Sequence, residues 1–227
     1  MTTAIPTVET PGPEIFDVEL EHSLLEENAR LARENRELLE HHSVVAVDFM
    51  GAIGSGKTSL IARLADMFND KTGVAIFSGD VTTIPHVDAL AGAGVPVVQI
   101  SGANGSQLDA NLVAKAIREI DLREIGFIFV EHLGSLFCPA AFPLGSKARV
   151  VVVSVTEGPC VIKKHPHLFF GADIVVINKI DISDVMSVSI DELTRDILTL
   201  KPDIKIIPMS CRTGDGLDEV ASALLAI

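Results

Sequence analysis

A glycine-rich segment of eight residues follows an apolar run, and it limits the folds that this chain can adopt more than any other feature of the sequence. The run 44–49 reads VVAVDF, and the segment 51–58 reads GAIGSGKT. Glycines let backbone N–H groups converge on phosphate oxygens without clashes from Cβ atoms. A helix that begins at the end of such a loop adds a partial positive charge at the same place. The pattern therefore predicts a P-loop that joins the first strand of the fold to its first helix.

The P-loop motif predicts which of its side chains contact the phosphates and the magnesium ion. Lys57 should reach the β- and γ-phosphates of a nucleoside triphosphate, and the Thr58 hydroxyl should hold Mg²⁺. The residues expected to surround the phosphates are Gly51, Gly54, Ser55, Gly56, Lys57, Thr58 and Ser59.

Short apolar runs alternate with helical patterns along the rest of the chain. The runs cover 44–49, 73–78, 95–100, 126–131, 149–155, 173–178 and 204–208, and the helical patterns fall near 57–70, 86–93, 109–120, 189–200 and 215–226. The runs are rich in Val and Ile and almost uninterrupted, which is typical of strands buried on both faces. This alternation predicts one α/β domain over 43–227, a P-loop NTPase with a mostly parallel sheet flanked by helices on both faces.

A second motif, NKID at 178–181, resembles the guanine-specificity motif of GTPases. The Asp181 carboxylate can accept hydrogen bonds from the N1–H and 2-amino groups of guanine. Adenine offers neither donor, so a site of this kind discriminates by roughly 10⁴-fold or more. The loop 210–212, after the last apolar run, resembles the loop that backs the base, and we expect GTP and GDP as ligands. The residues expected at the base are Asn178, Lys179, Asp181, Ser210 and Cys211.

Two acidic residues follow apolar runs and are candidates for the magnesium site. Glu131 ends the run 126–131 and precedes Gly134, whose N–H is expected to meet the γ-phosphate, and Asp80 follows the run 73–78. Because the carboxyl ends of parallel strands share one edge, both carboxylates should face the P-loop and its Mg²⁺. The alternative for each is a helix N-cap or a solvated strand end. The predicted catalytic set is Lys57, Thr58, Asp80 and Glu131.

The chain before the P-loop domain divides into two parts. Residues 1–13 are rich in Thr and Pro and are expected to form a disordered tail. Residues 14–42 predict an amphipathic helix, because Leu24, Leu31 and Leu38 recur every seven residues. Asn28 and Asn35 lie between these leucines, and Leu25, Ala32 and Leu39 lie alongside them. Packing of this helix on the domain body is favoured over binding of a partner, since a stripe alone does not select a partner.

Composition narrows the classes of partner. The formal net charge is −13, from 31 acidic and 18 basic residues, and no Lys/Arg run offers a local patch for nucleic acid. The N-terminus lacks a signal-peptide pattern, and no apolar run approaches membrane-spanning length. The three cysteines lie far apart, and their odd number argues against a disulfide framework. We expect a cytoplasmic protein that binds neither nucleic acid nor membrane.

These motifs, with several further segments, resemble the HypB family of nickel-insertion GTPases that act in the maturation of nickel-iron hydrogenases. The segments are VVAVDFMGAIGSGKTSL at 44–60, SGDV at 78–81, VEHLGSLFCPA at 130–140, TEG at 156–158, KHP at 164–166 and VVINKID at 175–181. The resemblance spans about 15–227 and implies a GTPase of the SIMIBI class, the group of signal-recognition and MinD-like proteins. It implies a homodimer that forms on GTP, in which Lys164 of one copy reaches the nucleotide of the other. It also implies two kinds of partner, another hydrogenase maturation factor and the precursor of the hydrogenase large subunit.

The sequence departs from that family where nickel is expected to bind. The family's metal motif reads TGxxCHLDA, whereas 101–110 reads SGANGSQLDA, with Ser106 and Gln107 in place of Cys and His. Serine and glutamine are poor ligands for Ni²⁺ or Zn²⁺. Cys138 matches a second family cysteine and is the remaining candidate ligand, and its alternative role is a small buried residue before Pro139.

The function predicted from these observations is hydrolysis of GTP as a switch in metallocentre assembly, with nickel insertion into a hydrogenase as its purpose. Hydrolysis is expected to be slow, because no Gln or Asp stands at a recognised switch position to orient the attacking water. The alternative is a family member that has lost nickel binding and acts as a GTP-dependent scaffold for partners.

Overall fold

The structure is a computed structural model that describes residues 15–79, 94–100, 108–134 and 142–227. Within the first helix, side chains are described from residue 23 onward. The predicted tail 1–13, the predicted helix 86–93 and the altered metal segment at 101–107 lie outside the described residues.

Seven strands form one sheet in which every neighbouring pair is parallel. Their order across the sheet is β3-β2-β4-β1-β5-β6-β7, so β1, which leads into the P-loop, lies at the centre. The strands are β1 (Val45–Met50), β2 (Val74–Ser78), β3 (Val97–Gln99), β4 (Phe127–Glu131), β5 (Ala148–Ser154), β6 (Ile174–Asn178) and β7 (Lys205–Pro208). Each predicted apolar run overlaps one strand, and the predicted α/β fold with a parallel sheet is confirmed.

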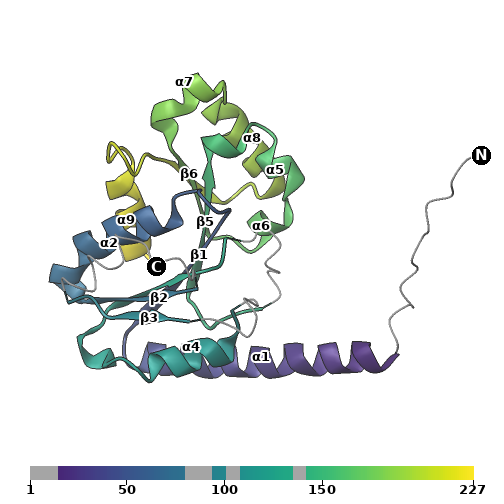
Figure 1. Ribbon diagram of the computed structural model, residues 1–227, viewed down its shortest axis with the longest axis vertical. Coiled ribbons are helices and arrows are strands. Elements are labelled where there is room, and N and C mark those ends of the chain that lie inside the picture. Colours follow the sequence, from purple (N-terminus) through teal and green to yellow (C-terminus); the bar gives the residue numbers. More distant parts are fainter. Residues whose placement is uncertain (1–14, 80–93, 101–107, 135–141) are drawn as a thin grey trace, which may run out of the picture.

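Helices cover both faces of the sheet (Figure 1). One face packs against α2 (Lys57–Thr72) and α9 (Leu217–Leu225). The other face packs against α4 (Ala110–Ile117) on one side and against α5 (Val161–Lys164), α6 (His167–Phe170) and α8 (Ile190–Leu200) on the other. Strands β2, β4 and β6 are buried at every position, which explains why their sequences are rich in Val, Ile and Phe and carry few polar residues.

The remaining short elements lie in the connections. They are η2 (Leu122–Glu124), η3 (Val155–Glu157), η4 (Ile180–Ile182) and α7 (Ser183–Met186). Over the described ranges, no helix combines the length and the apolar character that crossing a membrane requires.

Helix α1 (Ile15–His41) packs along α4 (Figure 1). Leu24 is 58% exposed and Leu38 is 42% exposed, so the leucines of the heptad pattern do not form the buried face. The helix packs on the domain body, the arrangement that the sequence favours, through the asparagines and the flanking residues of the predicted stripe rather than through its heptad leucines. The buried positions of the described part of the helix are Asn28, Ala32, Asn35 and Leu39.

Two buried asparagines fix the position of α1. The Asn35 amide donates hydrogen bonds to the carbonyl oxygens of Ala110 (2.8 Å) and Leu144 (3.0 Å). The Asn28 amide donates to the carbonyl of Pro143 (2.9 Å), and its oxygen accepts from the N–H of Ala110 (2.8 Å). These partners are backbone groups at the start of α4 and in the segment before β5. Because hydrogen bonds are directional, the asparagines fix both the register and the rotation of the helix.

Replacement of Asn35 by Ala should lower the free energy of unfolding by about 1–3 kcal/mol, because two buried carbonyls would lose a donor. Glu37→Ala, at an exposed position of the same helix, is the matched control and should change that free energy by less than about 0.5 kcal/mol. Urea unfolding of both variants measures the difference. Equal stability of the two variants would show that the Asn35 amide does not hold α1 in place.

Candidate nucleotide-binding site

The P-loop runs from the end of β1 into the first turn of α2. Gly56 occupies the N-cap position of α2 with a φ of 98°, and Lys57 is the first helical residue. The buried Lys57 side chain donates hydrogen bonds to the carbonyl oxygens of Gly51 and Ala52, both at 3.0 Å. The loop therefore curls around its own ammonium group, which holds a positive charge at the start of the helix.

The P-loop lies too close to the neighbouring strands for side chains at two of its glycines. A Cβ atom on Gly51 would stand 2.1 Å from the carbonyl oxygen of Val152, and one on Gly56 would stand 2.1 Å from the Asn178 amide nitrogen. The hydroxyl of Ser55 is fully buried in the loop and has no hydrogen-bond partner among the described residues. A close-packed loop at a helix N-terminus, with a buried hydroxyl to satisfy, fits a ligand with phosphate oxygens.

The Asn178 side chain joins the P-loop to the loop that follows β7. Its amide nitrogen donates to the carbonyl of Ser55 (2.8 Å), and its oxygen accepts from the backbone N–H groups of Lys179 (2.8 Å) and Cys211 (3.2 Å). The first residue of the NKID motif therefore connects the phosphate end of the site with its base end.

The Glu131 carboxylate, which is 1% exposed, lies beside the P-loop hydroxyl that we expect to bind magnesium. Thr58 Oγ1 donates a short hydrogen bond to Glu131 Oε1, and Ser78 Oγ donates to Oε2 at 3.2 Å. A carboxylate and a hydroxyl brought together from positions 73 residues apart form an oxygen donor set of the kind that Mg²⁺ prefers. The segment after Glu131 also touches the P-loop, because the N–H of Ile53 donates to the carbonyl of Gly134 (3.1 Å).

Asp181, the residue predicted to bind guanine, is held by the loop that follows β7. Ser210 Oγ donates to Asp181 Oδ1 (2.6 Å), and the Arg212 guanidinium lies 3.9 Å from Oδ2. Lys179 adopts a left-handed conformation with a φ of 65°, and its ammonium group donates to the carbonyl of Gly54 (2.7 Å). The NKID motif and the 210–212 loop therefore meet next to the P-loop, as the sequence predicts.

The metal candidates are only partly within the described residues. Asp80 and Cys138 lie outside them, and among the residues described there is no group of three His, Cys, Asp or Glu side chains that could hold a metal ion. Burial raises the pKa of the Cys211 thiol, so this cysteine stays neutral and is a poor metal ligand at neutral pH. Lys164 ends α5 and is exposed.

Sequence reasoning missed a buried charge cluster on the sheet face opposite α2. Ser146 Oγ donates to Asp48 Oδ1 (2.5 Å), while His132 Nε2 and Arg149 Nη2 lie 3.6 Å and 3.7 Å from Oδ2. Burial by itself would raise the pKa of Asp48, but these partners lower it below its ordinary value, so the carboxylate is ionised at neutral pH. The available signal was an acidic residue inside the apolar run 44–49. A second missed carboxylate, Glu157, lies in the turn after β5.

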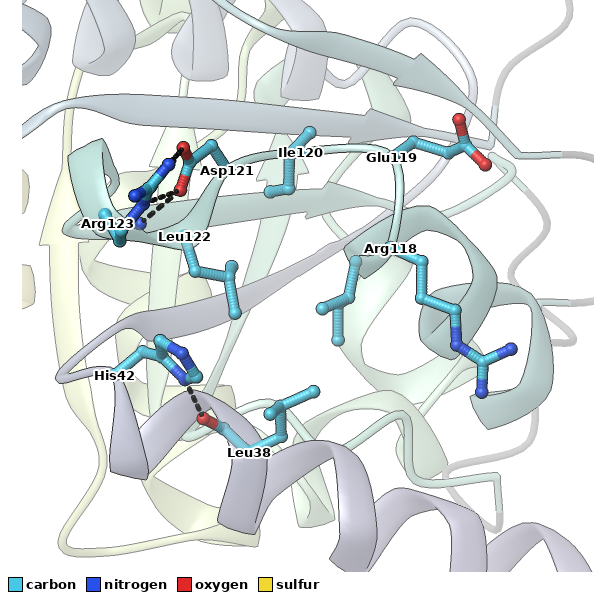
Figure 2. Close-up of a pocket in the computed structure, with 9 residues that line it drawn as sticks. Leu38, His42, Arg118, Glu119, Ile120, Asp121, Leu122 and Arg123 are labelled. Atoms are coloured by element: carbon cyan, nitrogen blue, oxygen red, sulfur yellow. Dashed lines mark hydrogen bonds and ion pairs between the residues drawn. The ribbon is translucent and has the colours of Figure 1, made fainter.

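A shallow pocket of about 510 Å³ lies away from this site (Figure 2). It is lined by Leu38 and His42 of the α1 end and by residues 117–123, which lead from α4 toward β4. These segments precede β1 and β4, so the pocket lies at the amino ends of the strands, whereas the P-loop lies at their carboxyl ends. Arg123 is paired with Asp121 on the pocket rim. The pocket therefore does not belong to the candidate nucleotide site.

The geometry of the two glycines predicts unequal effects of alanine in the P-loop. Gly54 and Gly56 both have positive φ, but only the Cβ of Gly56→Ala would meet another atom. Gly54→Ala should cost about 1–2 kcal/mol of stability from backbone strain. Gly56→Ala should cost about 1 kcal/mol more, because it also displaces Asn178 from Ser55. Urea unfolding without nucleotide compares them, and equal losses would contradict the close packing of the Asn178 amide on the loop.

Comparison with known proteins gives the family. Residues 45–208 match the family model described as CobW/HypB/UreG, nucleotide-binding domain. The probable hydrogenase maturation factor HypB of Methanocaldococcus jannaschii is 42% identical over 203 residues, which cover 89% of this chain and 92% of that protein.

Solved structures agree with that match. HypB from Archaeoglobus fulgidus has a TM-score of 0.84 and 36% identity, and the match covers 88% of this chain and 98% of that chain. HypB from Helicobacter pylori in complex with nickel has a TM-score of 0.80 and 30% identity, with 88% and 94% covered. The more distant LAO/AO transport system kinase, with a TM-score of 0.55 at 15% identity, shares the fold alone. By sequence, by fold and by the motifs that meet at one edge of its sheet, this chain belongs to the HypB family of hydrogenase maturation factors.

Proposed function

We propose that this protein binds GTP with Mg²⁺ and hydrolyses it slowly to GDP and phosphate, as a switch in the assembly of a nickel-iron hydrogenase. The observation that carries the proposal is the convergence of three features at the carboxyl edge of the sheet. These features are the P-loop around Lys57, the Thr58–Glu131 contact and the Asp181 carboxylate held by Ser210.

The residues divide the chemistry between them. The P-loop amides and Lys57 bind the phosphates and stabilise the negative charge that develops as water attacks the γ-phosphate. Thr58 and Glu131 are the proposed magnesium-binding residues, together with Asp80. Magnesium, when bound, neutralises charge on the phosphate oxygens. Gly134 follows Glu131 and contacts the P-loop through Ile53, so its N–H is a proposed contact of the γ-phosphate.

The cargo and partners of this switch are proposed from the family. Nickel is the proposed cargo, since the HypB structure from Helicobacter pylori was determined in complex with nickel. We propose that Cys138 takes part in holding it. GTP would favour a homodimer in which the exposed Lys164 reaches the nucleotide of the second copy. A second maturation factor and the precursor of the hydrogenase large subunit are the proposed partners, in the cytoplasm.

Asp181→Asn should abolish the preference for guanine. The amide nitrogen of Asn presents a donor to the N1–H and 2-amino donors of guanine, so we expect GTP affinity to fall by roughly 100-fold or more, with little change for ATP. Asp184→Asn, an exposed acid three residues later in α7, is the matched control and should bind GTP as the wild type does. Fluorescent nucleotide titration with Mg²⁺ measures binding, and single-turnover hydrolysis by the wild type measures activity. A wild type that binds ATP as tightly as GTP would refute the proposed function.

A second candidate function is favoured by Ser106 and Gln107, which stand where the family carries Cys and His. In this alternative the protein has kept its GTP cycle, has lost nickel binding and recruits partners as a scaffold.

Equilibrium dialysis against Ni²⁺ and Zn²⁺ separates the two candidate functions. If nickel is the cargo, the wild type should bind it and Cys138→Ala should lose at least about tenfold in affinity, because a thiolate ligand is removed. Cys160→Ala, at an exposed cysteine, is the control and should bind as the wild type does. A wild type that binds neither metal, with GDP or with a non-hydrolysable GTP analogue, would support the scaffold instead.

A further inference from the structure

Glu157 is an acidic residue set beside the lysines of the nucleotide site, and neither the P-loop nor the NKID motif explains it. It ends η3, the turn that directly follows β5. In the register of the sheet Ser154 stands beside Asn178, and the carbonyl of Val152 lies against Gly51. The turn that carries Glu157 therefore lies between the P-loop and the NKID segment.

A contact of this turn with Lys179, and the influence of both lysines on Glu157, support that location. The ammonium group of Lys179 lies 3.4 Å from Thr156 Oγ1, in the residue before Glu157. The charges of Lys57 and Lys179 both act on the Glu157 carboxyl. Burial nevertheless raises the pKa of this carboxyl, against the opposing effects of the Ser154 N–H and the two lysines. The protein therefore keeps a carboxylate where burial disfavours its charge.

The local structure of the turn explains why a side chain of this length with a hydrogen-bond acceptor stands at position 157. It does not explain why that side chain is charged. Its Oε1 accepts a hydrogen bond from the N–H of Ser154 (2.8 Å), and together these two residues form a capping box. Its Oε2 is buried and has no hydrogen-bond partner within the described part of the chain. A glutamine would close the same capping box without a buried charge. The negative charge itself thus calls for another explanation.

We propose that Glu157 weakens the binding of nucleotide phosphates and thereby speeds the release of GDP. Its negative charge partly cancels the positive charge that Lys57 and Lys179 present to a nucleotide, and it repels the phosphates directly. Glu157 acts through the field around the lysines, without touching the substrate. This inference rests on the proposed function, because it assumes that a guanine nucleotide occupies the P-loop.

Glu157→Gln tests the inference, since it keeps the capping acceptor and the size of the side chain and removes only the charge. Glu119→Gln is the matched control, because it removes the same charge beside the pocket of Figure 2, at the opposite edge of the sheet. Titration and stopped-flow displacement of a fluorescent GDP analogue, with Mg²⁺ and the full chain, measure affinity and release. We expect E157Q to bind GDP about five- to tenfold tighter and to release it more slowly by a similar factor. E119Q should match the wild type.

Salt provides a readout that a purely structural role would not change. The difference between wild type and E157Q should shrink as ionic strength rises from roughly 0.05 M to 1 M, because screening weakens the repulsion. Thermal melting checks that E157Q is folded, and Glu157→Ala, which also lacks the charge, repeats the test in a second variant.

The possible outcomes are distinguishable. Equal affinities of E157Q and wild type would overturn the inference. Weaker binding by a folded E157Q would also overturn it and would instead indicate a direct contact, such as acceptance of a hydrogen bond from a ribose hydroxyl. A wild type that binds no guanine nucleotide would refute the proposed function itself, whereas failure in E157Q alone leaves that function intact.

Discussion

The geometry of the whole site depends on the side-chain amide of Asn178. This one group donates to the P-loop at Ser55 and accepts from the loop that follows β7 at Cys211. Because Gly56 carries no Cβ, the amide packs directly on the backbone of the P-loop. The phosphate end and the base end of the site are thereby fixed relative to each other before a ligand arrives. Such preorganisation lowers the cost of ordering the site when a nucleotide binds.

Two buried carboxylates on neighbouring strands show how partners decide the role of an acid. Glu131 faces α2 and receives hydrogen bonds from two hydroxyls, whereas Asp48 faces the other side of the sheet, near His132 and Arg149. The basic partners of Asp48 already balance its charge. The two hydroxyls that donate to Glu131 are themselves oxygen donors for a hard cation. The nearby hydroxyls are the reason that Glu131, rather than Asp48, is the proposed magnesium ligand.

The parts of the molecule predicted well from the sequence are those set by contiguous residues. The P-loop, the strands and the NKID motif each depend on a short run of residues, and the pattern within that run is enough to predict its conformation. The heptad leucines alone do not show which side of α1 is buried, because the domain body presents backbone carbonyls there and Asn28 and Asn35 donate hydrogen bonds to them. The partners of Asp48 and the neighbours of Glu157 come from separate strands and turns, so no local pattern reveals them.

The residues proposed to contact the nucleotide and the residue proposed to bind metal lie close together in the sequence. Glu131 contacts the Thr58 hydroxyl, and Gly134 accepts a hydrogen bond from the P-loop at Ile53. In the proposed switch, a γ-phosphate would act on Gly134, only four positions before Cys138 in the sequence. The proposed metal ligand Cys138 therefore lies close in sequence to the proposed γ-phosphate contact, as a metal site controlled by nucleotide would require.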